Sequence, residues 1–283
     1  MTRLGGILTA MVTPFDEGGG LNEDAAVGLM HHLLENSSDG LVLTGTTGES
    51  PTLSDEEMAR MWELGAAECG DALVVAGTGT NDTHHSVKLT ERATEAGVDA
   101  VLVVAPYYNK PNRRGLIEHY KAVAAATDRP VILYNIPSRS VIDMPNDLLR
   151  ELAQIPNVAA VKQARYENLE PIDGLELLAG NDDVLADVLD MGGSGGILVA
   201  SHLVGPEMRR MIDEPDSRRE IHESLRDLFK TLFIAPSPAP TKAALKMLGH
   251  DVGGLRLPLV EASEAEQAVV REALERHGLL SRV

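Results

Sequence analysis

Residues 100–134 read AVLVVAPYYNKPNRRGLIEHYKAVAAATDRPVILY, and this stretch predicts one complete strand–helix–strand unit. The apolar runs Ala100–Ala105 and Val131–Tyr134 show no polar alternation, which is typical of parallel strands buried on both faces. Between them, Arg113–Ala126 carries apolar residues at helical spacing. We therefore expect two parallel strands joined by a helix that lies over the sheet.

The same unit recurs from one end of the chain to the other. Successive strand candidates between Thr47 and Lys162 end about 30 residues apart. Strict alternation of eight strands with helices predicts a closed (β/α)8 TIM barrel. A doubly wound open sheet is the alternative, but it usually has a glycine-rich phosphate turn after its first strand, and Val12–Phe15 is not one. The remaining strands are expected over Gly6–Val12, Gly40–Leu43, Ala72–Ala76, Val158–Val161, Leu175–Ala179 and Gly196–Val199.

The helical segments set the expected domain organisation. Ser54 and Glu57 form the pattern of a capping box, which predicts a helix start. Residues 1–205 are expected to form the barrel, and residues 206–283 the final barrel helix and a C-terminal helical extension of the same structural unit. Further helices are expected over Glu23–Glu35, Asp82–Ala96, Pro145–Ala153, Asp183–Met191, Arg218–Phe233, Pro240–Leu248 and Ser263–His277.

Composition limits the possible partners and compartments. The chain has 43 acidic and 25 basic residues, a net charge of −18, so neither nucleic acid nor an anionic membrane is an expected partner. The acidic, lysine-poor surface suggests adaptation to high salt, and an ordinary acidic enzyme is the alternative. A single cysteine, Cys69, and the lack of an 18-residue apolar run favour a cytoplasmic protein without disulfides or membrane spans.

Lys162 is the sharpest candidate for chemistry, because active sites of such barrels lie at the carboxyl ends of the strands. It ends the apolar run Val158–Val161 and should therefore point into the barrel mouth. Desolvation there disfavours the ammonium, and a neutral amine can form a Schiff base with a carbonyl compound. The alternative is a lysine that simply ends a strand at the surface.

Other polar side chains are expected on the same rim. Phenols and hydroxyls at strand ends can relay a proton, and a guanidinium suits a carboxylate. Packed tyrosines, an ordinary turn and a surface ion pair are the alternative interpretations. The candidates are Thr46 and Thr47 after the second strand, Tyr107 and Tyr108 after the fourth, and Tyr134 and Arg139 around the end of the fifth.

Taken in order, these segments resemble the pyruvate aldolase family of dihydrodipicolinate synthase and N-acetylneuraminate lyase, over nearly the whole chain. The resemblance implies that Lys162 forms an imine with pyruvate, without a metal or organic cofactor. It also implies a homo-oligomer, either a dimer or a dimer of dimers. The motifs that carry it are Val12–Phe15, Gly45–Glu49, Ala76–Gly79, Pro106–Pro111, Tyr134–Arg139 and Val161–Lys162, and the segments Pro236–Lys242 and Leu255–Pro258 add to it.

The remaining roles are likewise carried over from the family. Tyr134, Thr46 and Tyr108 would relay protons, with Tyr108 reaching into the site of a partner subunit. Thr47 would bind the pyruvate carboxylate and Arg139 the carboxylate of the second substrate. Gly180 and Ile197 would line the pyruvate pocket.

Arg139 favours one activity within the family: condensation of pyruvate with L-aspartate 4-semialdehyde to 4-hydroxy-tetrahydrodipicolinate, a lyase reaction of lysine and diaminopimelate biosynthesis. The alternatives are an aldolase for 2-keto-3-deoxy sugar acids, an N-acetylneuraminate lyase-like enzyme, and a non-catalytic barrel that binds a keto acid. Two stretches depart from the family pattern. Gln163 stands where the family often has glutamate, and Arg165–Asn168 is atypical.

Overall fold

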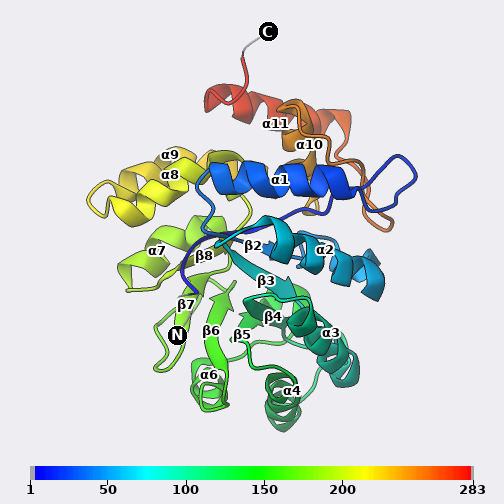
Figure 1. Cartoon of the computed structure of the whole chain (residues 1–283). Coiled ribbons are helices and arrows are strands. Elements are labelled where there is room, and N and C mark those ends of the chain that lie inside the picture. Colours follow the sequence, from blue (N-terminus) through cyan, green and yellow to red (C-terminus); the bar gives the residue numbers. More distant parts are fainter. Residues whose placement is uncertain (1–3, 282–283) are drawn as a thin grey trace.

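The computed structural model describes residues 4–281, and its centre is a closed barrel of parallel strands (Figure 1). Within these residues, eight strands pair in chain order, and the eighth pairs with the first. This confirms the predicted TIM barrel over the alternative of an open sheet. The strands are β1 (Gly6–Ala10), β2 (Gly40–Leu43), β3 (Leu73–Gly77), β4 (Ala100–Val104), β5 (Val131–Asn135), β6 (Val158–Gln163), β7 (Glu176–Ala179) and β8 (Gly195–Leu198).

Helices surround the barrel, as Figure 1 shows. The first helix after β8 packs against β1 as the final barrel helix, and the helices that follow it form the extension. None of the helices formed by residues 4–281 is long and apolar enough to cross a membrane. The helices are α1 (Glu23–Glu35), α2 (Asp55–Glu68), α3 (Thr83–Glu95), α4 (Arg113–Ala125), α5 (Pro137–Ser140), α6 (Asn146–Leu152), α7 (Leu185–Asp190), α8 (Ser201–Asp213), α9 (Arg218–Thr231), α10 (Ala239–Met247) and α11 (Glu264–Arg276).

The strands are apolar along their whole length because both of their faces are buried. On β5, Ile132 and Tyr134 belong to the cluster that fills the barrel, while Val131 and Leu133 belong to the layer between strands and helices. Side chains alternate between the two faces of a strand. On β6, Ala160 lies in the barrel cluster, so Lys162 two residues later faces the same interior.

Most predicted elements agree with the structure within one or two residues. The capping box of Ser54 and Glu57 opens α2 as expected, and a second box at Ser263 opens α11. The sequence predicted a final barrel helix from residue 206, but α8 already starts at Ser201. It continues across two breakers, since Val204 has non-helical dihedral angles and Pro206 follows. Gly205 is required there, since a Cβ atom would lie 2.1 Å from the carbonyl oxygen of Asn36 at the end of α1.

The C-terminal extension packs on one side of the barrel. Helix α10 contacts α8, and α11 contacts α9 and α10. In Figure 1 the two helices lie outside the ring of barrel helices, beyond α1. Residue 205, at which the sequence suggested a division, falls inside α8, so this helix connects the barrel to the extension without a linker.

Candidate active site

Lys162 and Tyr134 lie side by side at the mouth of the barrel. They are register partners on the adjacent strands β6 and β5. Only 6% of Lys162 is exposed, and its Nζ lies 4.1 Å from the centroid of the Tyr134 ring. A lysine side chain in its ammonium form gains a favourable cation–π contact at this distance from an aromatic face. The structure therefore brings together a buried amine and a phenol, as the strand-end reasoning predicted.

The loop after β2 carries Thr46 and Thr47 to the same rim. Its first residue, Thr44, has a φ of +52°, and its Oγ1 accepts a hydrogen bond of 2.8 Å from Trp62 Nε1. Thr13 Oγ1 donates to the carbonyl oxygen of Gly48 at 2.6 Å. Thr46 is half-buried and Thr47 is buried. These hydrogen bonds fix a conformation that few residues adopt freely, which gives the two hydroxyls a defined position.

The C-terminal extension holds the end of this loop through a buried ion pair. Glu49 and Lys242 are each 1% exposed, and Glu49 Oε1 lies 2.8 Å from Lys242 Nζ. Burial lowers the pKa of the Lys242 ammonium, and the charge of Glu49 opposes that shift. Lys242 Nζ also donates to the Gly254 carbonyl oxygen at 2.7 Å, and the Arg256 N–H donates to Glu49 Oε2 at 3.1 Å. From the sequence, Glu49, Lys242 and Arg256 were noted only as members of family motifs, and this ion pair was not predicted.

Tyr108 does not join the other candidates within one chain. Its backbone has a φ of +74°, and the residue is 85% exposed. The turn around it is fixed by Asn109, whose Nδ2 donates to the Asn81 carbonyl oxygen at 2.7 Å. The phenol is thus exposed to solvent at a turn that this hydrogen bond fixes.

Arg139 lies on the short helix α5, directly after β5, and is exposed. It lines a cavity of about 650 Å³ together with Ile136, Ala164, Arg165 and Asn168. Ile136 and Ala164 each lie two residues beyond Tyr134 and Lys162 on their strands. The cavity therefore opens beside the amine–phenol pair, and Arg139 supplies positive charge to its wall.

Gly180 follows β7, the neighbour of β6, and Ile197 lies on β8, one strand further around the barrel. A Cβ atom on Gly180 would lie 2.8 Å from the backbone nitrogen of Ala164, so a larger residue would push β6 and β7 apart. Ile197 is 1% exposed and belongs to the cluster that fills the barrel. Both residues lie where a pocket wall is expected, and their role in binding pyruvate stays a prediction.

Asp182 is a buried residue at this end of the barrel that sequence reasoning missed. Its Oδ1 accepts hydrogen bonds from the backbone N–H groups of Val199 and Ala200, at 2.9 and 3.0 Å. Burial raises the pKa of the Asp182 carboxyl to about 6, while these N–H groups and the charge of Lys162 act in the opposite direction. Asp182 thus ties the end of β8 to the turn after β7 and adds negative charge near the amine.

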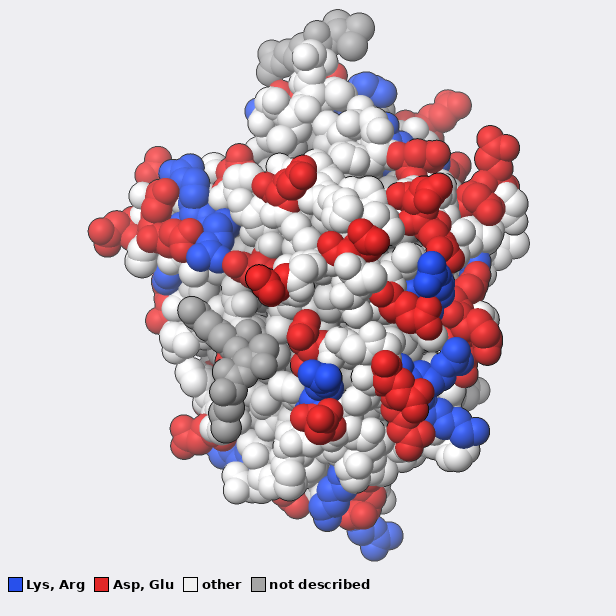
Figure 2. Space-filling view, in the orientation of Figure 1, with Lys and Arg blue, Asp and Glu red and all other residues white. Residues whose placement is uncertain are grey.

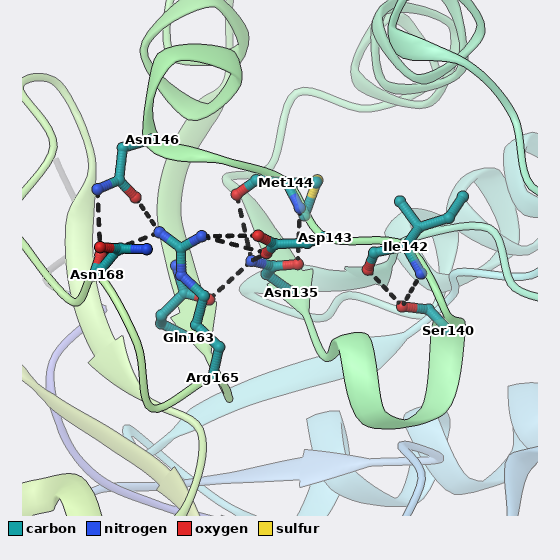
Figure 3. Close-up of polar contacts among 9 residues, drawn as sticks. All are labelled: Asn135, Ser140, Ile142, Asp143, Met144, Asn146, Gln163, Arg165 and Asn168. Atoms are coloured by element: carbon teal, nitrogen blue, oxygen red, sulfur yellow. Dashed lines mark hydrogen bonds and ion pairs between the residues drawn. The ribbon is translucent and has the colours of Figure 1, made fainter.

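A second group lies between the strands and α6: Asn135, Asp143, Gln163 and Arg165 form a connected set of hydrogen bonds (Figure 3). From the sequence, Gln163 and Arg165 were noted only as departures from the family pattern. The residue types alone did not indicate this network, because polar residues at strand ends also occur in ordinary loops.

Among residues 4–281, no group of three or more His, Cys, Asp or Glu side chains is arranged to hold a metal ion. The groups at the mouth instead suit imine formation, proton transfer and carboxylate binding.

Comparison with known proteins identifies the family. The sequence model of the dihydrodipicolinate synthetase family matches residues 3–277. The 4-hydroxy-tetrahydrodipicolinate synthase of Bacillus subtilis is 45% identical and covers 94% of this chain and 96% of its own length. The enzyme of the same name from Cyanothece sp. is 42% identical and covers 99% and 100%.

Solved structures agree with these relatives. The dihydrodipicolinate synthase of Cyanidioschyzon merolae, solved with lysine bound, superposes with a TM-score of 0.95 at 37% identity, covering 99% of this chain and 100% of that one. The enzyme from Thermotoga maritima gives a TM-score of 0.93 at 35% identity, with 99% and 100% covered. Because sequence and structure match over almost the full length, the chain belongs to the dihydrodipicolinate synthetase family.

Proposed function

We propose that this protein is a lyase that condenses pyruvate with L-aspartate 4-semialdehyde to 4-hydroxy-tetrahydrodipicolinate, through an imine on Lys162. One observation carries the proposal: Lys162 is a buried amine at the barrel mouth, 4.1 Å from the ring of Tyr134. The family of this chain supports the same reaction, since its relatives are named 4-hydroxy-tetrahydrodipicolinate synthase.

The first half of the reaction forms the imine. Lys162 Nζ attacks the ketone carbon of pyruvate, and the carbinolamine loses water to give a protonated imine. Two protons must reach the departing oxygen, and we assign their transfer to the Tyr134 phenol, the Thr46 hydroxyl and the Tyr108 phenol of a second copy. The hydroxyl and backbone N–H of Thr47 bind the pyruvate carboxylate. The negative charge of the pyruvate carboxylate is thereby held at the rim, beside the buried amine of Lys162.

The second half joins the two substrates. The iminium withdraws electrons, so the pyruvate methyl group loses a proton and becomes the nucleophilic carbon of an enamine. This carbon attacks the aldehyde carbon of the semialdehyde, whose carboxylate binds Arg139 in the adjacent cavity. The amino group of the semialdehyde then attacks the imine carbon and closes a six-membered ring. That step breaks the bond to Lys162 Nζ and frees the amine.

The exposed Tyr108 makes oligomerisation part of the proposal. A phenol that is 85% exposed in a single chain can take part in catalysis only if another subunit covers it. We therefore propose a homo-oligomer in which each Tyr108 enters the site of its neighbour. A dimer satisfies this requirement, and so does a dimer of dimers.

A comparison of substrates tests the choice of reaction. A coupled assay should give a higher kcat/KM for pyruvate with aspartate semialdehyde than for cleavage of 2-keto-3-deoxygluconate, since Arg139 offers a partner to the semialdehyde carboxylate. Lys162→Ala should lose both activities and serves as the control. A higher kcat/KM for the sugar acid would overturn the proposed acceptor and support an aldolase instead.

A further inference from the structure

Behind the Tyr134–Lys162 pair lies a buried bridge between two amide side chains. Asn135 and Gln163 directly follow the pair on β5 and β6, so they face the opposite side of the sheet. Both are buried, and Asn135 Nδ2 donates to Gln163 Oε1 at 2.9 Å. The neighbouring positions on this face, Leu133 and Val161, are apolar. Asn135 and Gln163 therefore place two polar side chains beside apolar neighbours on this face, and these side chains have specific hydrogen-bond partners.

Asn135 connects this bridge to the segment between α5 and α6. Its Nδ2 also donates to Asp143 Oδ1 at 2.8 Å, and its Oδ1 accepts from the Met144 N–H at 3.1 Å. One amide thus binds both the side chain and the backbone of the returning segment (Figure 3). The end of β5 and the segment after α5 are held together on the outer face of the sheet.

Arg165 closes the network from the end of β6. Its side chain is 9% exposed, and Nη1 donates to both oxygens of Asp143, at 2.9 and 3.2 Å. Nη2 donates to Asn146 Oδ1 and, at 3.0 Å, to the Asn168 carbonyl oxygen. Figure 3 shows the guanidinium between Asp143 on one side and Asn146 and Asn168 on the other. A single side chain therefore joins the loop after β6 to the start of α6.

The segment that this network fixes also carries Arg139. Helix α5 starts directly after Ile136, whose carbonyl oxygen accepts a hydrogen bond of 2.9 Å from Ser140 Oγ. The turn is therefore fixed at one end by β5 and at the other by Asp143. Because Arg139, Asp143 and Arg165 line the same cavity, a shift of Asp143 would move Arg139 relative to it.

We propose that Arg165 is a positioning residue for the acceptor substrate: acting through Asp143, it holds Arg139 where an acidic aldehyde binds. This inference rests on the proposed function, in which Arg139 binds that carboxylate. The pyruvate half of the site lies on the strand ends and on the loop after β2, whereas the hydrogen bonds of the guanidinium go to Asp143, Asn146 and Asn168. Arg165 therefore affects the acceptor half and leaves imine formation unchanged.

Three variants separate this role from a general loss of structure. Arg165→Met removes the guanidinium, and Asp143→Asn keeps the shape of the acid while removing the ion pair. Arg150→Met is the matched control, since Arg150 lies on the neighbouring α6, is half-exposed, and pairs with Glu170 instead of Asp143. Each variant is assayed for the KM of both substrates and for pyruvate adducts trapped with borohydride.

We expect Arg165→Met to raise the KM for aspartate semialdehyde about tenfold, while the KM for pyruvate and the trapping rate stay within about twofold of wild type. Asp143→Asn should likewise raise the KM for the semialdehyde and leave the KM for pyruvate nearly unchanged. The double variant should raise the KM for the semialdehyde little further, because both changes break the same interaction. Wild type should also prefer the semialdehyde to butanal, which lacks a carboxylate, and Arg165→Met should lose much of that preference. Arg150→Met should behave as wild type.

A failure of the proposed function can be distinguished from a failure of the positioning role of Arg165. If wild type forms no adduct at Lys162 or does not condense the semialdehyde, the proposed function is wrong. If wild type does both but Arg165→Met keeps its acceptor KM, or loses trapping to the same extent, the positioning role is wrong. Should Arg165→Met fold poorly, the KM values of Asp143→Asn decide between these outcomes, because Asp143 is partly exposed and its amide still accepts from Asn135.

Discussion

Tyr108 lies on a fixed turn at the barrel mouth with its phenol in solvent. Its proposed role as a proton relay therefore depends on a neighbouring subunit. Tyr108→Phe should lower kcat by about 10²-fold, the lower range for loss of a positioned acid–base group. The Tm of the isolated chain gains nothing from an exposed hydroxyl, so thermal melting should be unchanged. An unchanged kcat would remove Tyr108 from the relay.

A mixing experiment shows whether the phenol crosses between subunits. Lys162→Ala and Tyr108→Phe proteins should each be nearly inactive alone. After subunit exchange, a mixed oligomer contains one site with an intact Lys162 from one chain and an intact Tyr108 from the other. Recovery of activity on mixing is the expected result. If activity stays at the level of the separate variants, each Tyr108 serves its own chain or none.

His202 is a buried histidine that links stability to pH. Its Nε2 accepts a hydrogen bond of 3.2 Å from the Val12 N–H, and its Nδ1 donates to the Val199 carbonyl oxygen at 2.8 Å. Protonation would place a second N–H against that of Val12. Burial accordingly lowers the pKa of His202 from 6.5 to about 4, and burial lowers that of His119 to about 4 as well.

The sign of the pH effect follows from these two pKa values. Between pH 6.5 and 4 the unfolded chain binds more protons than the folded one, so the stability present above pH 6.5 is lost as the pH falls through this window. His202→Gln should flatten the dependence by an amount on the order of 3 kcal/mol across the window. Urea unfolding at several pH values measures it, and His84→Gln, at an exposed position, should keep the wild-type slope. The same slope in both variants would contradict this assignment.

At the residue scale, sequence reasoning succeeded where a polar residue interrupts an apolar run. Lys162 ends a buried strand, and this alone indicated an amine inside the barrel. Arg165 gave no such signal, because an arginine three residues past a strand end is typical of a protein surface. Only the positions of Asp143 and Asn168, both brought near by the fold, show that its guanidinium is buried.

At the scale of elements, the strands were predictable because each is a short apolar run between two helical segments. Elements whose form depends on packing were harder to predict. Helix α8 contains a kink at Val204 and a proline, and the lack of a side chain at Gly205 allows it to pack closely against the end of α1. The four-residue α5 is too short for any periodicity, although it carries Arg139.

The extension and the loop after β2 are joined by the ion pair of Lys242 and Glu49, which are both buried. Lys242→Met would leave Glu49 as an uncompensated buried charge, at a cost of about 3–5 kcal/mol. The expected result is a clear fall in Tm and in the urea midpoint. Lys121→Met makes the same chemical change in the exposed pair with Glu118 and should alter both values little. Equal effects of the two variants would show that burial of the pair does not matter.

The whole molecule carries a net charge of −18, and acidic side chains outnumber basic ones on the face seen in Figure 2. Like charges at this density repel one another in the folded state. Because 1 M salt shortens the screening length to about 3 Å, Tm should rise from low salt to molar KCl. Sucrose at matched osmolality does not screen charge and serves as the control. An equal Tm at low and high KCl would contradict adaptation to high salt.

Barrel closure is the whole-molecule property that the sequence predicted best, since eight alternating strands leave few other arrangements. The oligomer was harder to predict from the sequence, because contacts of Tyr108 with another subunit leave no periodic pattern in one chain. The resemblance to a known family supplied that expectation, and the exposed phenol gives it a physical reason.

The proposed chemistry depends on a covalent bond between the amine of Lys162 and pyruvate, and borohydride trapping detects this bond. The protein is incubated with pyruvate, reduced with borohydride, digested and examined by mass spectrometry, with Lys162→Ala as the control. One reduced pyruvate adduct is expected, on the peptide that contains Lys162, and none in the variant. An adduct on another lysine, or no adduct in a wild-type protein that still turns over substrate, would contradict it.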